Sequence, residues 1–353
     1  MKPDPIEASS PYSVRASTPE DGPAIVALMA EVGLRPNVEP RHLHWRYWQE
    51  REDSPGPRSY VVSDGSALLA HAALIPLSYE VQGHHLRMAH LIDWAARPGE
   101  PGTGAMLLRH AAARSDAMIG IGGSEATLKI LPLLGFKTCG SVTGYVHTLR
   151  PLKLIAAASQ PSWRLIPRIA RSAVWCTTAP RIANNRWRAR RIPADQLREL
   201  APLLAGRGGS VSAFERSDAL LRYMLSCPIV PMECFVVEQG ANPRGYFILA
   251  FVHHQARLVD ARVDTDAPAD WRALIHCAVL EAKRDTAVAE LATWGSDAML
   301  AQVLEECGFH ARFTMPFWAR SRKTATFPPP IFRVQMLDSD AAYLHQGRGA
   351  LWA

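Results

Sequence analysis

The sequence predicts a mixed α/β fold, of the α+β kind, in which two similar domains share one chain. In each half, strand signals gather first and a helix and strand alternation follows. This order favours a mixed, largely antiparallel twisted sheet flanked by helices over a doubly wound sheet. At 353 residues the chain is long enough for two domains that each bury a core. Its hydrophobic content of 48% and charged content of 20% are those of a folded globular protein.

An internal repeat supports the two-domain prediction. Ser124–Leu128 recurs as Ser296–Leu300 at an offset of 172, and each is followed by a Gly-Phe pair. Upstream, Leu43–Trp48 matches Ala219–Met224 at an offset of 176. Each match alone is weak, but several matches in one order at nearly one offset indicate a duplication.

The elements of the first half follow from local signals. Thr18, followed by Pro19 and three residues before Asp21, predicts a helix start. Alternating apolar residues bounded by turn signals predict the strands. The expected elements are a strand at 12–16, helices at 18–32 and 40–50, strands at 58–63, 67–81 and 86–96, a helix from Ala105, a strand at 117–121, a helix at 124–134 and a final hairpin at 137–149. The second half repeats this order from about 190 to 319.

A glycine loop precedes the helix that begins near Ala105. Gly99, Gly102 and Gly104 lie in the run Pro-Gly-Glu-Pro-Gly-Thr-Gly. Glycines at a helix start let an anion approach the backbone closely, and the free N–H groups and the helix dipole then favour a phosphate. The loop therefore predicts a phosphate site, in which Thr103 can add a hydroxyl donor.

This order of elements resembles the GNAT superfamily of acyl-CoA-dependent acyltransferases, over about residues 12–150 and more weakly over 190–320. In that family a bulged strand precedes a loop of pattern Gln/Arg-x-x-Gly-x-Gly/Ala, whose amides bind the pyrophosphate of coenzyme A. The resemblance implies acetyl-CoA or a related thioester as co-substrate. The first position of the pattern holds Gly99 here, which departs from the family. The residues that the resemblance assigns to coenzyme A are Gly99, Gly102, Thr103, Gly104 and Ala105.

The same resemblance suggests how the chain is divided. The expected parts are a disordered tail at 1–11, an acyl-CoA-binding domain at 12–150, a basic linker at 151–189, a degenerate domain at 190–322 and a C-terminal extension at 323–353. The second copy is expected to be degenerate because Asp264, Asp266 and Asp270 stand where the glycine loop would fall, and their charges would repel a pyrophosphate. Two-copy relatives often act near polysaccharide biosynthesis, and Asp338-Ser339-Asp340 resembles a tail found among them.

Acyl transfer from a thioester needs a base for the attacking group and an acid for the departing thiol. Asp93, five residues before Pro98, is the candidate base; the alternative is a structural carboxylate beside the loop. Strand alternation places His90 on the opposite face. Relatives often carry a tyrosine as the acid where this chain has Leu131, so water, Tyr145 or Ser124 would substitute. Ser124 is more simply a helix cap and Tyr145 a core residue.

The aromatic run Trp45–Trp48 has two interpretations. These side chains can line an acceptor site, where they would stack on a sugar ring, or pack in the core, which we favour because the second copy keeps the Arg-Tyr pair. The pairs His84-His85 and His253-His254 are expected on exposed turns. The sequence offers them no convincing metal-ligand partners, so we predict no metal.

A basic stretch separates the two predicted domains. No acidic residue occurs between Ala126 and Ala194, and the net charge of the chain is +6. Arg164, Arg168 and Arg171 share one face of a predicted helix, which fits a linker packed between domains or, as an alternative, peripheral contact with an anionic membrane. Nucleic acid is the less favoured partner because no known binding module accompanies the charge.

Other features of the sequence point to the cytoplasm. The first residues lack the pattern of a secretory signal, and no apolar stretch approaches the roughly 20 residues of a membrane span. The six cysteines are scattered without a Cys-x-x-Cys pair, which favours reduced, mostly buried thiols.

We therefore predict a cytoplasmic N- or O-acyltransferase that moves an acetyl or related group from coenzyme A to a small-molecule or sugar acceptor. Two alternatives remain from the sequence. One is aminoacyl transfer from charged tRNA, as in FemAB-like relatives of this fold. The other is a non-catalytic scaffold at the membrane face of a polysaccharide-assembly complex.

Overall fold

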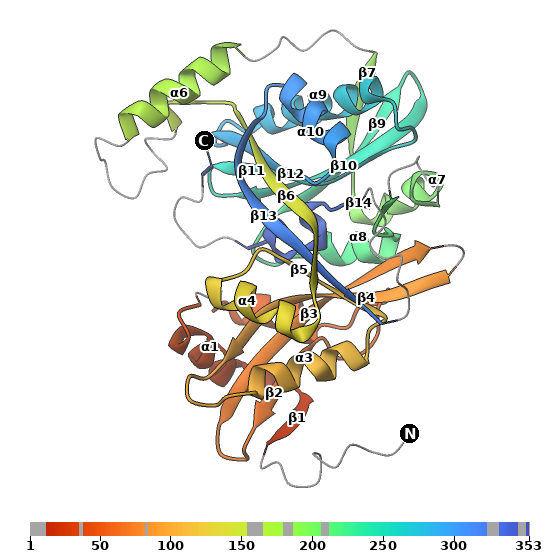
Figure 1. The fold of residues 1–353 in the computed structure, drawn as a ribbon. Helices are drawn as coiled ribbons and strands as arrows, with labels where there is room; N and C mark the ends of the chain where they lie inside the picture. Colours follow the sequence, from red (N-terminus) through yellow and green to blue (C-terminus); the bar gives the residue numbers. More distant parts are fainter. Residues whose placement is uncertain are drawn as a thin grey trace.

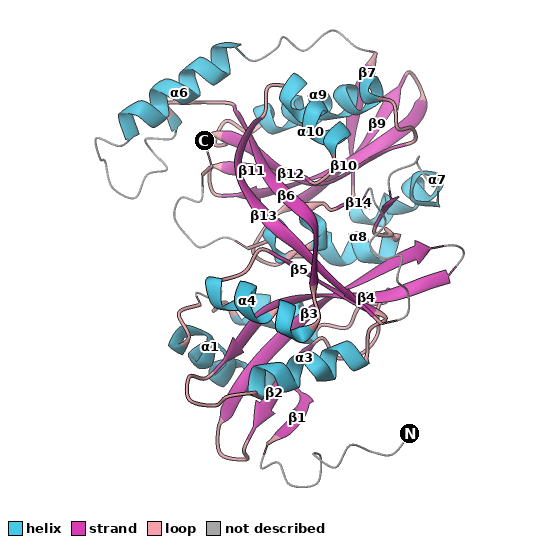
Figure 2. Cartoon of the chain, viewed as in Figure 1, coloured by secondary structure: helices cyan, strands magenta, loops and turns pink. Residues whose placement is uncertain are grey.

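The computed structural model describes residues 12–34, 38–81, 84–153, 165–178, 186–205, 212–322, 332–344 and 351–352. The expected tail at 1–11 and most of the linker at 151–189 lie outside these ranges. Figures 1 and 2 show two sheet-and-helix halves, with helices on the faces of a strongly twisted sheet. The predicted fold class, a mixed and largely antiparallel sheet flanked by helices, is confirmed.

The N-terminal half, residues 12–150, follows the expected order. Thr18 caps a 3-10 turn and Pro19 begins it, as the sequence predicts. The second predicted helix continues as a π-helix, which the sequence did not indicate. Its elements are β1 Ser13–Ala16, α1 Gly22–Glu31, α2 Pro40–Leu43, the π-helix η2 His44–Trp48, β2 Ser59–Ser63, β3 Leu68–Val81, β4 His84–Ala96, α3 Thr103–Ala113, β5 Ala117–Ile121, α4 Glu125–Ile130, the 3-10 turn η3 Pro132–Leu134 and β6 Lys137–Thr148.

The C-terminal half, residues 190–322, repeats this order, and a short C-terminal segment at 332–344 follows it. The linker contributes one described helix, α6 Leu165–Thr178. The remaining elements are β7 Trp187–Ile192, η4 Ala194–Leu200, α7 Ala201–Ala205, β8 Ser212–Ala213, α8 Asp218–Leu225, β9 Met232–Gln239, β10 Asn242–Val252, β11 Gln255–Val263, α9 Pro268–Arg284, β12 Glu290–Gly295, α10 Ala298–Glu306, β13 His310–Ser321, β14 Phe332–Arg333, η5 Met336–Asp338 and η6 Asp340–Ala342.

One sheet of twelve strands runs through both halves, in the order β1-β2-β3-β4-β5-β13-β6-β12-β11-β10-β9-β7. The last strand of each half is exchanged: β13 lies between β5 and β6, and β6 lies between β13 and β12. Figure 1 shows these two long strands crossing from one half to the other. The sheet therefore crosses the domain boundaries expected at 150 and 190.

The hairpin expected at 137–149 is wrong, because the whole stretch forms the single strand β6. Two glycines within it, Gly140 and Gly144, mark no turn. Gly140 has φ +148° and faces a register shift in β13. A Cβ at Gly144 would lie 2.4 Å from the ring of Phe313, so glycine lets this side chain cross the strand. Both glycines accommodate β13.

Alternation along β3 builds the cores on its two faces. Ala73, Ile75 and Leu77 pack into a central core that extends into the C-terminal half and its C-terminal segment. Ala72 and Leu74 face the other way and pack with α3. A third core lies under α9 and α10. Because the central core draws on both halves, neither half buries its own apolar surface alone.

Two further expectations concern cysteines and membrane spans. All six cysteines are free, and Cys227, Cys234, Cys277 and Cys307 are buried, as predicted. Among the helices that the structure describes, none has the length and apolar character of a membrane span.

Candidate active site

The two central parallel strands of the N-terminal half diverge partway along their length. β4 pairs with β5 from Met88 and Ala117 to His90 and Ile119. Beyond this point β4 continues to Ala96 paired with β3, and β5 continues to Ile121 paired with β13, but the two strands no longer pair with each other. The divergence opens a wedge between the two strands, and β4 leads directly into the glycine loop.

The glycine loop ends at the first turn of α3. Gly102 caps the helix in the left-handed region with φ +88°, where a side chain is disfavoured, and a Cβ there would meet nothing within 4 Å. No described residue accepts a hydrogen bond from the N–H groups of Thr103, Gly104 or Ala105. Thr103 Oγ1 is used inside the loop, donating to the carbonyl of Glu100 at 2.9 Å. The start of α3 can therefore accept an anion through its backbone.

Asp93 lies at an irregularity of β4. Its φ of +50° is unusual for a residue with a side chain, and the β3–β4 register shifts beside it. His71 on β3 contacts the strained peptide: its Nδ1 lies 3.2 Å from the carbonyl of Asp93. Burial lowers the pKa of His71 to about 4, so its ring is neutral and can donate this bond. The bulge and His71 together hold the conformation of Asp93.

The side chain of Asp93 is held by Arg46 and Tyr47 of η2. Arg46 Nη2 lies 2.8 Å from Asp93 Oδ2, and the Tyr47 hydroxyl donates to the same oxygen at 2.7 Å. Burial opposes the charge of Arg46, but Asp93 and Asp340 nevertheless raise its pKa well above the usual value. No described residue donates a hydrogen bond to Oδ1 of Asp93. The candidate base is thus fixed through one oxygen, which leaves the other for a substrate proton.

The C-terminal segment contributes a second carboxylate. Arg46 Nη2 also lies 2.9 Å from Asp340 Oδ2, and Asp340 is 21% exposed. His90 Nδ1 contacts the carbonyl of Asp338 at 2.9 Å. His90 and Asp93 therefore both face this segment, contrary to the expected opposite faces, because the bulge at Asp93 interrupts strand alternation. Sequence reasoning missed Asp340 as a neighbour of Asp93, since 247 residues separate them along the chain.

The C-terminal half contains a similar cluster that is sealed. Arg216 pairs with Asp260 on β11 and with Asp338, each at 2.8 Å, and the Tyr246 hydroxyl donates to Asp260 at 2.7 Å. Asp260 and Asp338 are 0% and 1% exposed. Burial raises the pKa of Asp338 to about 6 despite Arg216. The two aspartates occupy corresponding places in their strand pairs. Asp260 lies two residues before Arg262, which pairs with Tyr246 on β10. Asp93 likewise lies two residues before Ala95, which pairs with His71 on β3.

The strands β11 and β12 also diverge, after Arg257 and Ala292, but here the C-terminal segment enters the wedge. Gln335 accepts a hydrogen bond from the N–H of Ala261 on β11 at 2.7 Å. Ser296, which follows β12, contacts both the carbonyl of Phe332 and the N–H of Val334. The wedge of the C-terminal half is therefore filled by the protein itself.

The acidic loop of the C-terminal half is also occupied. Asp264 and Asp270 pair with Arg244 at 2.8 and 3.1 Å, and the helix that follows begins at Pro268, which has no N–H to offer. This corner differs from the glycine loop in both charge and backbone.

The structure does not bring Tyr145 near Asp93. Tyr145 on β6 packs in the core under α9 and α10, where burial raises its pKa. Ser124 caps α4 by accepting from the N–H of Thr127, the simpler of its two predicted roles. Leu131 is buried among apolar neighbours. The role of Tyr145 as the acid for the departing thiol stays a prediction.

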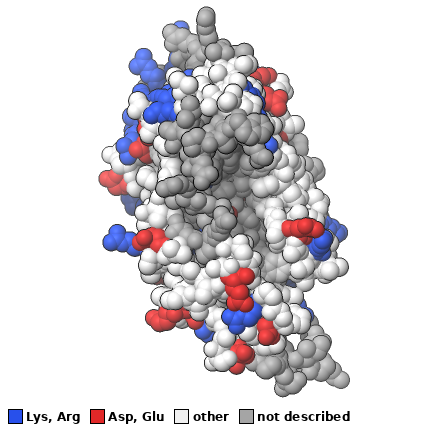
Figure 3. Space-filling model, turned by 90° about the vertical axis from the view of Figure 1, so that its left-hand side faces the viewer, with Lys and Arg blue, Asp and Glu red and all other residues white. Residues whose placement is uncertain are grey.

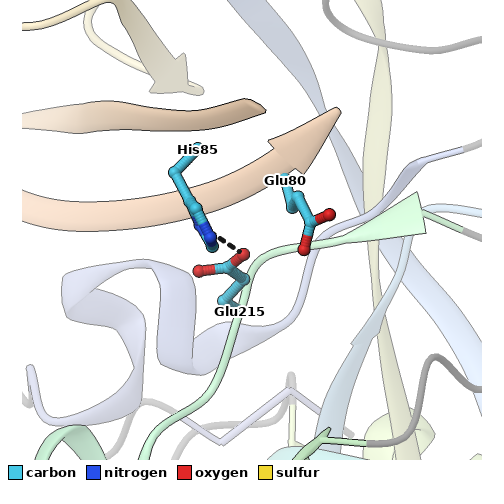
Figure 4. Close-up of side chains that lie close together, drawn as sticks. All are labelled: Glu80, His85 and Glu215. Atoms are coloured by element: carbon cyan, nitrogen blue, oxygen red, sulfur yellow. Dashed lines mark ion pairs between the residues drawn. The ribbon is translucent and has the colours of Figure 1, made fainter. Parts of the chain in front are cut away.

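Three side chains with ligand atoms meet near the β3–β4 hairpin. Glu80, His85 and Glu215 offer one ligand atom each within 4.8 Å of one another, and Figure 4 shows them converging from the two halves. His85 is 71% exposed, as the sequence predicts, and its Nδ1 pairs with Glu215 at 3.1 Å. The ion pair accounts for His85 and Glu215, and acidic groups near the surface commonly gather without an ion, so we assign no metal to the three residues. His253 lies on an exposed turn, also as predicted.

The described arginines of α6 contact the protein. Arg168 donates to the carbonyl of Leu351, and Arg171 lies over the ring of Trp175 at 4.8 Å. Arg164 lies outside the described residues. Figure 3, which views the molecule from the side of α6, shows blue side chains gathered in the upper part of that face. Membrane contact stays a prediction.

Comparison with known proteins identifies the fold. No family model and no curated protein sequence matches the chain. Among solved structures, a conserved protein of unknown function from Enterococcus faecalis, described as a probable N-acyltransferase, superposes with a TM-score of 0.59 at 14% identity, over 90% of this chain and 74% of its own.

GCN5-related N-acetyltransferases from Anabaena variabilis and Kribbella flavida give TM-scores of 0.58 and 0.54 at 11% and 12% identity. Each comparison covers 88% of this chain, with 72% and 71% of the other. The chain thus has the fold of the GNAT superfamily, as its motifs suggest.

Proposed function

We propose that the protein is an acyltransferase whose donor is acetyl-CoA or a related acyl-CoA. The observation that carries this proposal is the left-handed glycine at the start of α3, whose first N–H groups have no acceptor among the described residues, next to the point where β4 and β5 cease to pair. The pyrophosphate would bind the N–H groups of residues 103–105, and the thioester would extend into the wedge.

Asp93 is the base in this proposal. The amine or hydroxyl of the acceptor attacks the thioester carbon, a bond from nitrogen or oxygen to carbon forms, and Asp93 Oδ1 takes the proton. The carbon–sulfur bond then breaks, and the thiolate leaves as coenzyme A after taking a proton from water. Backbone N–H groups where β4 leaves β5 would stabilise the oxyanion. Arg46 and Tyr47 keep the carboxylate in place.

The donor proposal is tested by calorimetric titration with acetyl-CoA. We expect saturable binding to the unmodified protein and a loss of at least about 100-fold in Gly102→Asp, where a carboxylate would face the pyrophosphate. Because φ at Gly102 is +88°, any side chain strains the loop, so circular dichroism must first show that the variant is folded. Gly102→Ala, which carries the same strain without the charge, is measured beside it and should lose less binding. Ala269→Asp, at the exposed start of α9, is the matched control and should change nothing. Absence of binding at millimolar acetyl-CoA in a folded sample would contradict the proposal.

A further inference from the structure

A pocket of about 800 Å³ opens between the two halves, away from the glycine loop. Its walls come from α1, from α2 and η2, and from residues just after α8 of the C-terminal half. The volume is that of a small-molecule site. The lining residues that the argument uses are Val38, Arg41, His44, Trp45, Trp48 and Ser226.

The wall of the pocket is mostly carbon. Four of its residues are prolines, which have no N–H to donate. The indole N–H of Trp45 donates to the carbonyl of Tyr223 at 3.2 Å, and that of Trp48 donates to Ser17 Oγ at 3.0 Å. Both rings therefore use their polar edge within the protein. Arg41, His44, Gln49 and Ser226 supply the few polar groups. Such a wall suits an apolar body that carries a polar group.

The π-helix η2 connects the pocket with Asp93. Its wide turn is closed by a hydrogen bond from the N–H of Gln49 to the carbonyl of His44 at 2.8 Å. Trp45 and Trp48 line the pocket, while Arg46 and Tyr47 between them contact Asp93. Short π-helical turns are rare and are found frequently at functional sites. One turn of chain thus forms both the pocket wall and the support of the candidate base.

A chain of buried hydrogen bonds makes the same connection through other residues. Trp48 donates to Ser17, and Ser17 Oγ donates to Ser59 Oγ at 2.6 Å. Ser59 Oγ lies 2.9 Å from His71 Nε2, and the opposite ring nitrogen reaches the carbonyl of Asp93. Because His71 is neutral, each donor in this chain has one acceptor. The position of the Trp48 ring is therefore coupled to the strained peptide of Asp93.

We infer that this pocket binds the apolar body of the acyl acceptor. The role as acceptor site rests on the proposed function, whereas the binding of an apolar ligand does not. A sugar, the acceptor that the resemblance suggests, would need a polar partner for each hydroxyl, and this wall offers few. The aromatic run at 45–48, for which the sequence favoured core packing, thus serves both purposes: Trp45 is buried and still lines the pocket.

The test uses the neutral fluorescent probe N-phenyl-1-naphthylamine on the full chain. We expect saturable binding, and displacement by n-alkylamines from butylamine to octylamine that strengthens about three- to fourfold per added methylene. Glucosamine should not displace the probe. Val38→Trp fills the pocket from its rim, where Val38 is 63% exposed, and should weaken probe binding at least tenfold. Leu133→Trp, at an 84% exposed site on η3, is the matched control and should bind as the unmodified protein does.

Absence of saturable probe binding, equal binding by Val38→Trp, or displacement by glucosamine as strong as by octylamine would overturn the inference. The titration with acetyl-CoA is run on the same samples. If the alkylamines bind while acetyl-CoA does not, the pocket stands and the transfer reaction fails. If acetyl-CoA binds while the alkylamines do not, the reaction stands and the apolar acceptor fails.

Discussion

The two halves of this protein share one framework and differ in what occupies the wedge between their parallel strands. In the N-terminal half the wedge between β4 and β5 leads to a glycine loop whose last N–H groups have no acceptor among the described residues. In the C-terminal half the wedge between β11 and β12 holds the C-terminal segment, and the loop beyond it is acidic and paired. The comparison teaches that one framework can leave the gap between two parallel strands to an outside ligand or fill it with the protein's own chain.

The carboxylate clusters repeat this contrast. Each has one buried arginine between two carboxylates, with a tyrosine on the strand carboxylate. The cluster of the N-terminal half keeps exposed edges at Asp93 and Asp340, at 9% and 21%, whereas that of the C-terminal half is closed. Asp338 and Asp340 belong to one short segment, so both clusters depend on it.

Removal of residues 332–353 should have the largest effect. Val334, Met336, Leu337 and Tyr343 are at most 4% exposed, and burial of each contributes about 1.5–3 kcal/mol. Their sum approaches the 5–15 kcal/mol by which a typical domain is stable. The shortened chain should not refold, as judged by circular dichroism, and Leu337→Ala should lose about 2–5 kcal/mol. A shortened chain that unfolds cooperatively at the original temperature would show that the segment is dispensable.

Asp260→Asn and Asp93→Asn separate a structural carboxylate from a catalytic one. Removing one partner of a buried ion pair costs about 3–5 kcal/mol, so Asp260→Asn should lower the melting temperature strongly. Each arginine keeps a second carboxylate, Asp338 or Asp340, but Asp93 and Asp340 are partly exposed where Asp260 and Asp338 are not, so Asp93→Asn should destabilise less. It should lower acetyl-CoA-dependent acetylation of octylamine at least about 100-fold. Release of the coenzyme A thiol measures the rate. If Asp260→Asn were stable but inactive, the assignment of a structural role to Asp260 and a catalytic role to Asp93 would be wrong.

His71 should make the N-terminal half sensitive to acid. Burial lowers its pKa from the usual 6.5 to about 4, so the unfolded chain takes up a proton at a higher pH than the native one. Stability that is present above pH 6.5 is therefore lost as the pH falls toward 4, by about 3 kcal/mol. Urea unfolding between pH 7 and pH 4 measures the loss. His71→Asn should be less stable than the unmodified protein at pH 7 and should lose less stability between pH 7 and pH 4. His253→Asn, on an exposed turn, should change neither quantity.

The double change Asp264→Asn and Asp270→Asn should have the smallest effect. Both carboxylates pair with Arg244 near the surface, and such pairs contribute about 0.2–1 kcal/mol each. Removing the charges should not create acetyl-CoA binding, because α9 still begins at Pro268 without glycine. Calorimetry on this variant checks that prediction. Detectable binding would mean that charge alone distinguishes the two loops.

Much of this architecture could be predicted from local signals. Alternating apolar residues predicted most strands, Thr18 with Pro19 predicted a helix start, and the glycine loop predicted a second helix start, two residues after the observed one at Thr103. These features depend on neighbours a few residues apart. The two-half organisation could be predicted because equivalent local signals recur at nearly one offset along the chain.

What could not be predicted depends on contacts distant in the chain. The interleaving of β6 and β13 is decided by pairing over about 170 residues, and nothing in the strand pattern of 137–148 specifies its partners. The pairing of Asp340 with Arg46 is similarly remote. The π-helical turn at 44–48 is set by packing of its aromatic rings on both halves, which a helical period of 3.6 does not reveal.

The exchange of β6 and β13 has a consequence for how such a protein can evolve. The C-terminal half could be lost at little cost if its strands paired only with one another. Here its loss would remove the neighbour of β5 and leave unpaired strand edges, which favour aggregation. The pairing therefore ties the survival of each half to that of the other, whatever each half binds, and shortened descendants should be rare.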